Sequence, residues 1–457
     1  MQGDGFVKDS RMEDTPPSVS RHTGAKQGGE IRARWAWVEP AVWTERMLRA
    51  LEEGVKGGVW FGLMDKVYSR ANLAAAFKKV KANRGGAGVD RMPLRGFEAN
   101  LEQELDRLHE QLRTGRYRPQ AVRRAWIPKG PGALRPLGIP TVRDRVVQTA
   151  LRNVLEPIFE REFAEHSYGF RPGRGAKDAL RRVDRLLREG YVHVVDADIR
   201  GYFDTIPKIP LMERVQERVV DGRVLALLTA YLNQPVLEEM RQWTPEHGTP
   251  QGAVISPLLA NLYLNPLDHR MASRGFEMVR YADDFVVLCR TRAEAEAALA
   301  AIGEWMTEAS LTLHPDKTRI ADLNAGEFFD FLGYRFKHQE GKGIRRYPRP
   351  KSLRNLREKV REKTRRCSGH SLQTIIAQIN PSVRGWFEYF KHSHRTVFPE
   401  VDGWVRMRLR SILRKRSKRS GRGRGADHQR WPNSFFVEHG LFCLTSAHAR
   451  LRQSPCG

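Results

Sequence analysis

The stretch Arg280-Tyr281-Ala282-Asp283-Asp284 decides how the rest of the chain is interpreted. Phe276–Val279 precedes it and Phe285–Leu288 follows it, so apolar residues lead into an acidic pair and out again. This pattern predicts two short strands joined by a tight turn that carries both carboxylates. Carboxylate oxygens are the ligands that Mg²⁺ prefers, and a hairpin would hold them in place. A solvated acidic turn is the alternative, and the rest of the chain must decide between the two.

A second acidic cluster ends another predicted strand. The run Tyr191-Val-His-Val-Val-Asp-Ala-Asp198 is rich in β-branched residues and closes on two aspartates. If this strand lies beside the hairpin, Asp198, Asp283 and Asp284 form one carboxylate set. Such a set suits two-metal phosphoryl transfer, in which two Mg²⁺ ions about 3.5 to 4 Å apart activate a hydroxyl and stabilise the leaving group.

A basic hairpin is predicted between residues 121 and 140. Ala121–Pro128 alternates like a strand, Lys129–Arg135 forms a Gly- and Pro-containing turn, and Pro136–Pro140 leads out. Lys129 and Arg135 flank the turn and can reach one anion together, which suits a triphosphate. An ordinary solvated hairpin is the alternative.

The composition predicts a nucleic-acid partner. The 457 residues suffice for two or three domains, and 79 Lys and Arg against 53 Asp and Glu give a formal charge of +26. Such an excess of positive charge favours binding to a polyanion. No apolar run approaches the ~18 residues of a membrane span, no secretory signal opens the chain, and the four cysteines form no CxxC pair. We therefore expect no membrane association and a cytoplasmic location.

The positive charge is concentrated near the C-terminus. Residues 337–424 contain 26 Lys or Arg and six acids. Trp404, Leu409 and Ile412 make an apolar helical stripe in this segment, and arginines surround it. A solvated basic face is the alternative, but the size of the imbalance favours RNA binding. The candidate RNA-binding residues are Arg406, Arg408, Arg410 and Arg414.

The hydrophobic spacing also predicts the other elements. Helices are expected over residues 45–55, 73–81, 101–112, most of 141–190, 211–240, 258–264 and 292–310. A short strand and turn are expected over residues 311–318, and another strand over residues 328–336.

An ordered series of motifs resembles the reverse transcriptase and maturase encoded within bacterial group II introns. The resemblance covers residues from about 60 to 415. Its motifs are Asn83–Asp90, Ile127-Pro-Lys with Arg135–Pro140, Tyr168–Pro172, Asp198–Asp204, Thr249–Gly252 with Ser256–Asn261, Tyr281–Asp284, Lys317-Thr318, Phe331–Tyr334 and Arg384–Phe390.

The resemblance implies an α/β (α+β) right-hand polymerase. Residues 61–336 would form the fingers and palm, and residues 337–420 an α-helical basic thumb that is also the maturase (X) domain. Residues 1–60 would be an N-terminal leader, and residues 421–457 a basic linker and a short tail. Relatives often end in an HNH endonuclease with cysteine pairs, and the unpaired cysteines here predict that this domain is absent.

Roles for single residues also follow from the resemblance. Asp198 and Asp283 would bind two Mg²⁺ ions, with Asp284 beside them and the Ile199 carbonyl as a lesser ligand. Phe203 matches the aromatic gate that favours dNTPs. Lys129 and Arg135 match triphosphate contacts and Gln251 a nucleotide-pocket residue. Lys317 is either the acid that protonates pyrophosphate or a surface lysine.

The implied function is RNA-directed DNA synthesis coupled to intron splicing. The enzyme would bind its intron RNA, a DNA target or primer and dNTPs, and would support mobility by target-primed reverse transcription. Two alternatives stay open. One is an RNA-binding splicing cofactor with a dispensable polymerase fold, and the other is a related reverse transcriptase in a defence or CRISPR role. The sequence leaves the oligomeric state open.

Overall fold

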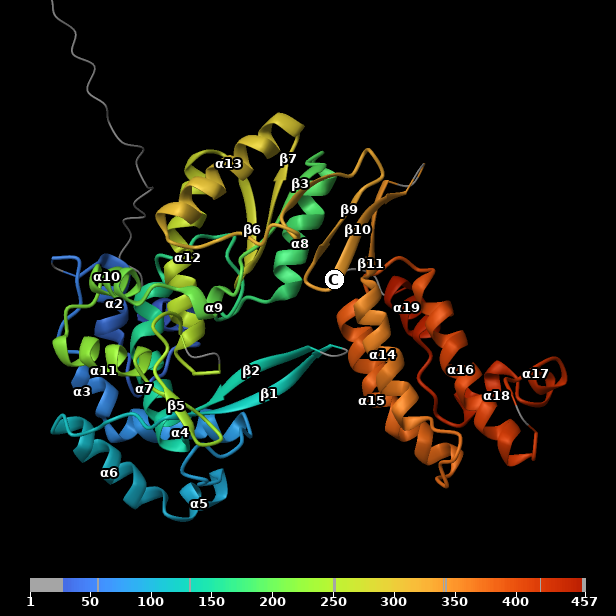
Figure 1. Ribbon diagram of the computed structural model, residues 1–457, viewed down its shortest axis with the longest axis horizontal. Helices are drawn as coiled ribbons and strands as arrows, with labels where there is room; N and C mark the ends of the chain where they lie inside the picture. The colour runs from blue at the N-terminus through green and yellow to red at the C-terminus, as the bar shows by residue number, and fades with distance from the viewer. Residues whose placement is uncertain are drawn as a thin grey trace, which may run out of the picture.

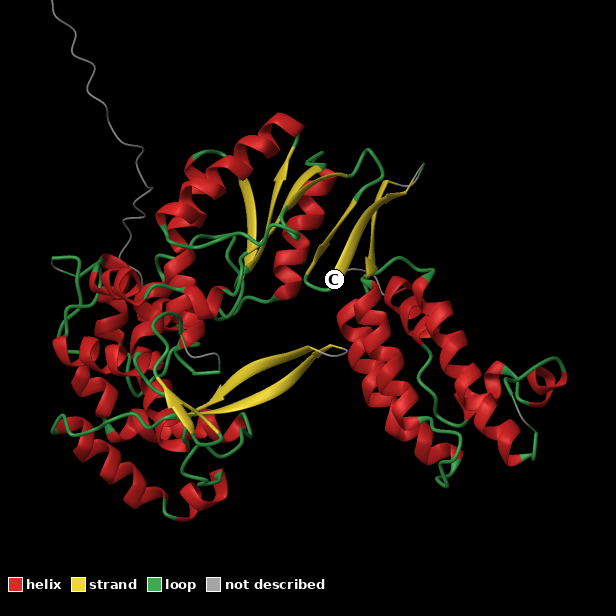
Figure 2. Ribbon diagram, viewed as in Figure 1, coloured by secondary structure: helices red, strands yellow, loops and turns green. Residues whose placement is uncertain are grey.

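The computed structural model describes residues 28–55, 57–130, 133–249, 252–339, 341, 343–419 and 421–453. The mixed helix and sheet architecture, followed by a helical domain, confirms the predicted fold class. Figure 1 shows the N-terminal helices with the β1–β2 hairpin on one side, a sheet with its helices above them, and helices α14–α19 on the other side. Figure 2 shows that strands gather in the middle third of the fold and that both flanks are helical.

The palm sheet carries the predicted acidic strands. Its order is β6 (Glu277–Tyr281), β7 (Asp284–Cys289), β3 (His193–Asp198) and β8 (Arg319–Asp322), all antiparallel. Side chains alternate across it, as the two-residue period of a strand requires. Val195 packs in the same core as helices α12 (Ser256–Ser273) and α13 (Arg292–Glu308), whereas Val194 packs with α8 (Ala176–Arg188). The sheet is therefore covered on both faces.

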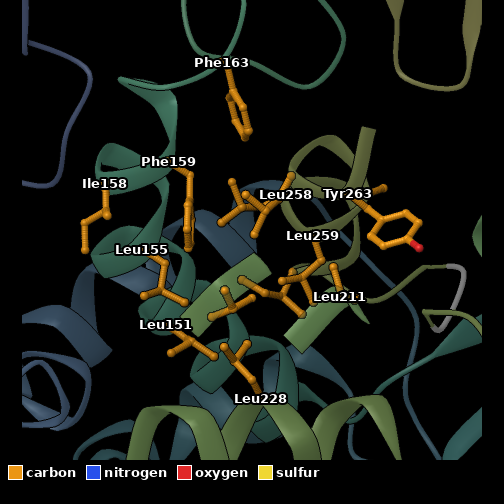
Figure 3. Packing of buried hydrophobic residues seen from close by; sticks show 14 of the residues in the cluster. Leu151, Leu155, Ile158, Phe159, Phe163, Leu211, Leu228, Leu258, Leu259 and Tyr263 are labelled. Carbon is orange, nitrogen blue, oxygen red and sulfur yellow. The ribbon is translucent and has the colours of Figure 1, made fainter. Parts of the chain in front are cut away.

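Helix α7 (Val142–Glu160) is the centre of the N-terminal half and is buried along nearly its whole length. Figure 3 shows Leu151, Leu155 and Phe159 of this helix close to Leu258 and Leu259 of α12. The surrounding helices are α1 (Gly28–Arg34), α2 (Glu45–Glu53), α3 (Met64–Tyr68), α4 (Arg70–Ala82), α5 (Leu94–Ala99), α6 (Leu101–Arg113), α9 (Tyr202–Thr205), α10 (Lys208–Gln216) and α11 (Gly222–Leu232).

The described part of the predicted leader is folded onto this core. Trp43 has no exposed surface, and its indole Nε1 donates a 2.9 Å hydrogen bond to the carbonyl oxygen of Asn153 in α7. Residues 1–27 lie outside the described residues. The segment from residue 28 onward is thus part of the globular N-terminal half.

The fingers sheet contains the predicted basic hairpin and two strands that were not predicted. Strands β1 (Val122–Gly130) and β2 (Ala133–Ile139) form the hairpin. Strands β4 (Val236–Glu238) and β5 (Arg241–Trp243) extend it, because Val236 pairs in parallel with Val122. The prediction of helix throughout residues 211–240 is therefore wrong after Leu232.

The strand predicted over residues 328–336 is a hairpin. Strands β9 (Phe328–Phe331) and β10 (Tyr334–Gln339) are joined by Leu332 and Gly333, which both have positive φ, and β11 (Gly343–Pro348) pairs with β10. The domain boundary predicted at residue 337 therefore falls inside β10, and the helical domain begins at Pro350.

Of the short strand and turn predicted over residues 311–318, the turn forms at residues 315–317 and the strand does not. Only an isolated bridge between Leu313 and Ile199 forms there, and the strand β8 begins at Arg319. Pro315 and the following turn interrupt the pattern, so the chain joins the sheet later than the alternation of Leu311 and Leu313 suggests.

The C-terminal helical domain has its own core. Its helices are α14 (Pro350–Lys363), α15 (Leu372–Phe390), α16 (Val397–Arg416), α17 (Ala426–Arg430), α18 (Asn433–Glu438) and α19 (Leu444–Gln453). Buried Asp402 of α16 accepts hydrogen bonds from the backbone N–H groups of Leu444 and Thr445, at 3.0 and 2.9 Å. The predicted tail, where described, is therefore an integral part of this domain.

Among the described residues, no helix combines the length and apolar character that a membrane crossing requires.

Candidate active site

The predicted acidic hairpin forms as expected. Tyr281 and Asp284 are register partners, so only Ala282 and Asp283 lie between β6 and β7. Ala282 has a φ of 59°, the left-handed conformation that tight two-residue hairpins need. This turn places Asp283 at the tip and leaves Asp284 as the first residue of β7.

The third aspartate lies opposite the hairpin. Asp198 on β3 is the register partner of Asp284 on β7. Residues directly opposite one another in antiparallel strands share a face, so these two carboxylates are on the same side of the sheet. Asp196 is two residues earlier on β3 and therefore shares that face. The structure thus brings Asp198, Asp283 and Asp284 together and adds Asp196.

Burial and mutual repulsion make Asp196, Asp283 and Asp284 hard to ionise. Burial raises the pKa of Asp284 to about 7, and the charges of Asp196 and Asp283 add to the rise. Burial likewise raises the pKa of Asp196 to about 6, with Arg319 opposing the shift. The pKa of Asp283 is also raised, first by burial, and the charge of Asp198 adds to it. A bound cation would relieve this repulsion, which is the behaviour of a cation-binding cluster.

Asp198 is paired with a lysine. The Lys317 ammonium forms an ion pair with the Asp198 carboxylate, and the side chains are 54% and 38% exposed. The His314 backbone N–H donates 2.7 Å to the Asp198 carbonyl oxygen, which fixes the strand end. Within the described part of the chain, no three His, Cys, Asp or Glu side chains are grouped closely enough to hold a metal ion. The carboxylate oxygens of the aspartates are suitable ligands for Mg²⁺. In this structure the positive charge beside Asp198 is the Lys317 ammonium.

A buried arginine holds the acidic turn. Arg280 has no exposed surface and forms an ion pair with Asp268 of α12. Its Nη1 donates 2.9 Å to the Ala282 carbonyl oxygen and 2.9 Å to Asn261 Oδ1. We gave these residues no role from the sequence, where Arg280 resembles any other cation of a basic chain.

The Tyr168–Pro172 motif packs against the same turn. The Tyr168 N–H donates 2.9 Å to the Arg280 carbonyl oxygen, and Asn261 Nδ2 donates 2.7 Å to that of Gly169. A Cβ on Gly169 would lie 2.2 Å from the Ala282 nitrogen, so only glycine permits this approach. The Tyr168–Pro172 motif thus supports the acidic turn.

The predicted nucleotide contacts are only partly described. Arg135 is exposed on β2, and its charge opposes the rise in the pKa of Asp283. The Lys129 side chain and the whole of Gln251 lie outside the described residues. Phe203 is half-buried in α9, and its carbonyl oxygen accepts a 2.8 Å hydrogen bond from the Thr249 N–H. The side chain of Ile199 is buried, with an exposed fraction of 3%.

The β9–β10 turn connects the acids to the helical domain. The Leu332 backbone hydrogen-bonds the Asp284 carboxylate and opposes the rise in its pKa. The Tyr389 hydroxyl of α15 donates 2.8 Å to the Leu332 carbonyl oxygen. The Arg349 N–H donates 2.9 Å to the Gly333 carbonyl oxygen.

Three of the four arginines predicted to bind RNA have partners inside the helical domain. Arg410 is 4% exposed and donates to the Trp431 carbonyl oxygen at 2.9 Å. Arg408 donates to the Thr364 carbonyl oxygen at 2.7 Å, and Arg414 forms an ion pair with Asp427. Arg406 is half-buried, and its Nε has no hydrogen-bond partner in the described chain. Of the arginines along α16, Arg410 therefore packs inside the domain, and Arg406 stays a candidate for RNA contact.

Two family models match this chain. Residues 127–336 match the model described as reverse transcriptase (RNA-dependent DNA polymerase), and residues 353–431 match the group II intron maturase-specific domain. Protein YkfC of Escherichia coli strain K12 is 33% identical over 344 residues, which cover 66% of this chain and 86% of YkfC.

Further matches include intron-encoded proteins. Group II intron-encoded protein LtrA of Lactococcus lactis subsp. cremoris is 36% identical over 196 residues, which cover 42% of this chain and 32% of LtrA. The chain thus spans about a third of LtrA in this match. A chain of the partial Cas6-RT-Cas1–Cas2 complex is 26% identical with a TM-score of 0.36, and the match covers 54% of this chain and 41% of that chain.

Proposed function

The chain belongs to the reverse transcriptases that carry a group II intron maturase domain, and from this we propose that it is an RNA-directed DNA polymerase that also binds its intron RNA. In this role it assists splicing and supports intron mobility by target-primed reverse transcription in the cytoplasm. Its substrates are dNTPs, an RNA template and a DNA primer or target. The observation that carries the proposal is the pairing of Asp198 with Asp284, with Asp283 at the adjoining turn.

Asp198, Asp283 and Asp284, with the Ile199 carbonyl, are the groups that would hold Mg²⁺ in this proposal. Two such ions, when bound, activate the primer hydroxyl and stabilise the leaving pyrophosphate. The repulsion among the carboxylates favours cation binding, and Lys317 must then leave Asp198. In that released position Lys317 is free to act as the acid toward pyrophosphate.

The remaining proposed contacts orient the nucleotide. Arg135 and Lys129 on the fingers hairpin bind the triphosphate, and Gln251 borders the nucleotide pocket. Phe203 crowds the sugar 2′ position and so favours dNTPs over rNTPs. Arg280 keeps the acidic turn in its left-handed conformation through the Ala282 carbonyl oxygen.

Primer extension on an RNA template tests the proposal. We expect Asp283→Ala to reduce cDNA synthesis by at least about 10³-fold, because it removes a ligand of ions that supply most of the charge stabilisation. Asp316→Ala is the matched control, since the Asp316 side chain is 89% exposed and lies outside the acid cluster. Unchanged synthesis by Asp283→Ala would show that the active site is elsewhere.

One observation favours the alternative of a splicing cofactor without polymerase activity. The Lys317 ammonium forms an ion pair with Asp198, so one of the carboxylates proposed to hold Mg²⁺ already has a cationic partner. Under this alternative, the wild-type protein promotes intron splicing in vitro but incorporates no dNTP at any Mg²⁺ concentration. Incorporation by the wild-type protein would exclude it.

A further inference from the structure

A cavity of about 850 Å³ lies between the palm and the C-terminal helical domain. Helix α8, the β10–β11 hairpin, the loop between α15 and α16, and helix α19 each contribute to its wall. We call it the junction cavity. Strand β10 runs from the Leu332 turn beside Asp284 to His338 in the cavity wall, a path of about 20 Å at 3.3 Å per residue. The junction cavity is therefore separate from the catalytic acids.

A neutralised ion pair forms part of the cavity wall. Asp184 of α8 forms an ion pair with Arg346 of β11, and Arg346 Nε donates 2.8 Å to the His392 carbonyl oxygen. Among the described residues that line the cavity, Asp184 is the single acid. Arg346 pairs with it directly and the charge of Arg188 also acts on it, so the five arginines and one aspartate of the lining leave a balance of +4.

Four further arginines line the cavity, and none of them forms an ion pair with a described carboxylate. Arg188, Arg345, Arg395 and Arg452 are exposed, and no described carboxylate forms an ion pair with any of them. They come from four different elements, so the fold gathers them from across the sequence. Four unbalanced positive charges in one concave site create a strong positive potential.

Histidines extend this basic lining. Burial, and then the charges of Arg346 and Lys391, lower the pKa of His392. Burial, and then the charge of Arg452, lower the pKa of His448. Both rings are therefore neutral near pH 7 and can donate an N–H to an anion without adding charge.

We propose that the junction cavity binds the phosphate groups of an RNA strand held between the palm and the C-terminal helical domain. The ligand is a phosphodiester chain because the planar guanidinium fork matches phosphate oxygens, and all five basic side chains that line the cavity besides histidine are arginine. A single phosphate ion would leave at least two of the four unbalanced charges uncompensated, whereas a strand supplies one charge per residue. Phe336, the single described aromatic apart from histidine in the lining, is 1% exposed, so the lining offers no Phe, Tyr or Trp platform for a base. Its exposed guanidinium groups suit the phosphates of the strand.

The proposal rests on the proposed function, because it assigns part of the intron RNA contact to this site. It extends that function by locating a phosphate contact away from α16, where three of the four predicted arginines are used internally.

The test uses the full-length protein and a fluorescently labelled 30-nucleotide RNA hairpin. The site variant is Arg188→Gln/Arg395→Gln/Arg452→Gln, which removes three exposed charges without touching the Asp184–Arg346 pair. The control variant is Arg46→Gln/Arg95→Gln/Arg107→Gln, which removes three exposed charges from α2, α5 and α6. The dissociation constant is measured by anisotropy from 50 to 400 mM KCl. Melting curves check that both variants fold.

We expect the slope of log Kd against log[KCl] to fall by about 2 to 3 in the site variant, because each lost phosphate contact contributes about 0.7 to 0.9. The control should change it by less than about 1. Equal slopes for the site variant and the wild type would overturn the proposal. A small anionic dye that binds the cavity tests for a small-anion site. If 10 mM inorganic phosphate displaces the dye while the slope for RNA is the same in the site variant and the wild type, the cavity binds small anions and the proposal is overturned.

Primer extension on a short template separates this inference from the proposed function. The site variant should extend such a primer at the wild-type rate, because its residues are outside the catalytic machinery. If the wild type extends no primer but the slope difference is found, the polymerase proposal fails and the RNA site stands. If extension is normal and the slopes are equal, the RNA site fails alone.

Discussion

Arg280 donates a hydrogen bond of 2.9 Å to the carbonyl oxygen of Ala282, two residues along the chain, from a guanidinium without exposed surface. The bond fixes the left-handed residue that precedes Asp283, the proposed metal ligand. The same guanidinium contacts Asp268 and Asn261 of α12, so the position of the acidic turn depends on the helix behind the sheet.

Arg280→Lys tests this dependence. A single ammonium cannot satisfy Asp268, Asn261 and Ala282 together, and we expect kcat to fall about 10- to 100-fold with little change in KM for dNTP. The free energy of unfolding should fall by about 3 kcal/mol, as for a damaged buried ion pair. Steady-state primer extension and denaturant unfolding measure the two effects. A folded variant with wild-type kcat would show that the turn holds its shape without Arg280.

Lys317→Met tests the pairing with Asp198. Without the competing ammonium, the Mg²⁺ concentration for half-maximal activity should fall, and loss of a general acid should lower kcat by about 10²-fold. Lys317→Arg keeps the positive charge but cannot release a proton, so it should restore the Mg²⁺ requirement and not kcat. Mg²⁺ titrations of primer extension measure both. Wild-type kcat in both variants would make Lys317 a surface residue without a chemical role.

Phe203→Ala tests the sugar gate. Removing the ring should reduce the preference for dATP over ATP by about 10- to 200-fold, the range for one shape-based contact in a pocket. Phe61→Ala is the control, since Phe61 is 73% exposed. The ratio of kcat/KM for the two nucleotides is the measurement. An unchanged ratio would show that Phe203 packs in the protein core and does not discriminate between the two sugars.

Asp196→Asn tests the half-buried carboxyl next to the proposed metal ligands. The pKa of Asp196 is about 6 in the folded protein, against an ordinary value of 3.8 for aspartate, so ionisation favours the unfolded chain. This group therefore stabilises the protein least above pH 6, and the wild type should lose about 1 kcal/mol from it between pH 5 and pH 7.5. Asparagine does not ionise, so the variant should lose less over that range. Urea unfolding in EDTA at the two pH values measures the difference, and parallel losses in both proteins would refute it.

Arg410→Met and Arg406→Met separate packing from RNA binding in α16. Arg410 is buried against Trp431 and Phe436, so its replacement should destabilise the helical domain by about 2 kcal/mol. Arg406→Met should leave unfolding unchanged and reduce the slope of log Kd for RNA against log[KCl] by about 0.7 to 0.9. Chemical unfolding and anisotropy measure the two. The reverse pattern would assign the RNA contact to Arg410.

The local parts of the site could be predicted from the sequence. The Tyr281–Asp284 turn, the strand that ends at Asp198 and the fingers hairpin depend on alternation and turn residues that lie within a few positions of one another. Their mutual placement followed from the order of motifs, and the structure confirms it in the register of Asp198 with Asp284.

The missed parts depend on distant partners. Strand β4 forms because Val236 pairs with Val122, more than 100 residues away, and no local pattern records that pairing. In the sequence Arg410 resembles a surface cation, because its partners Trp431 and Asn433 are more than 20 residues away. The Leu332-Gly333 turn was missed because one apolar run was interpreted as one strand, although Gly333 permits a reversal.

The bond between Tyr389 and Leu332 connects the C-terminal helical domain to the acid cluster. The Leu332 backbone hydrogen-bonds the Asp284 carboxylate, and its carbonyl oxygen accepts the Tyr389 hydroxyl. A ligand whose binding moved α15 enough to alter these bonds would be linked to the ionisation of Asp284, and protonation of Asp284 would change the affinity for that ligand by the same free energy.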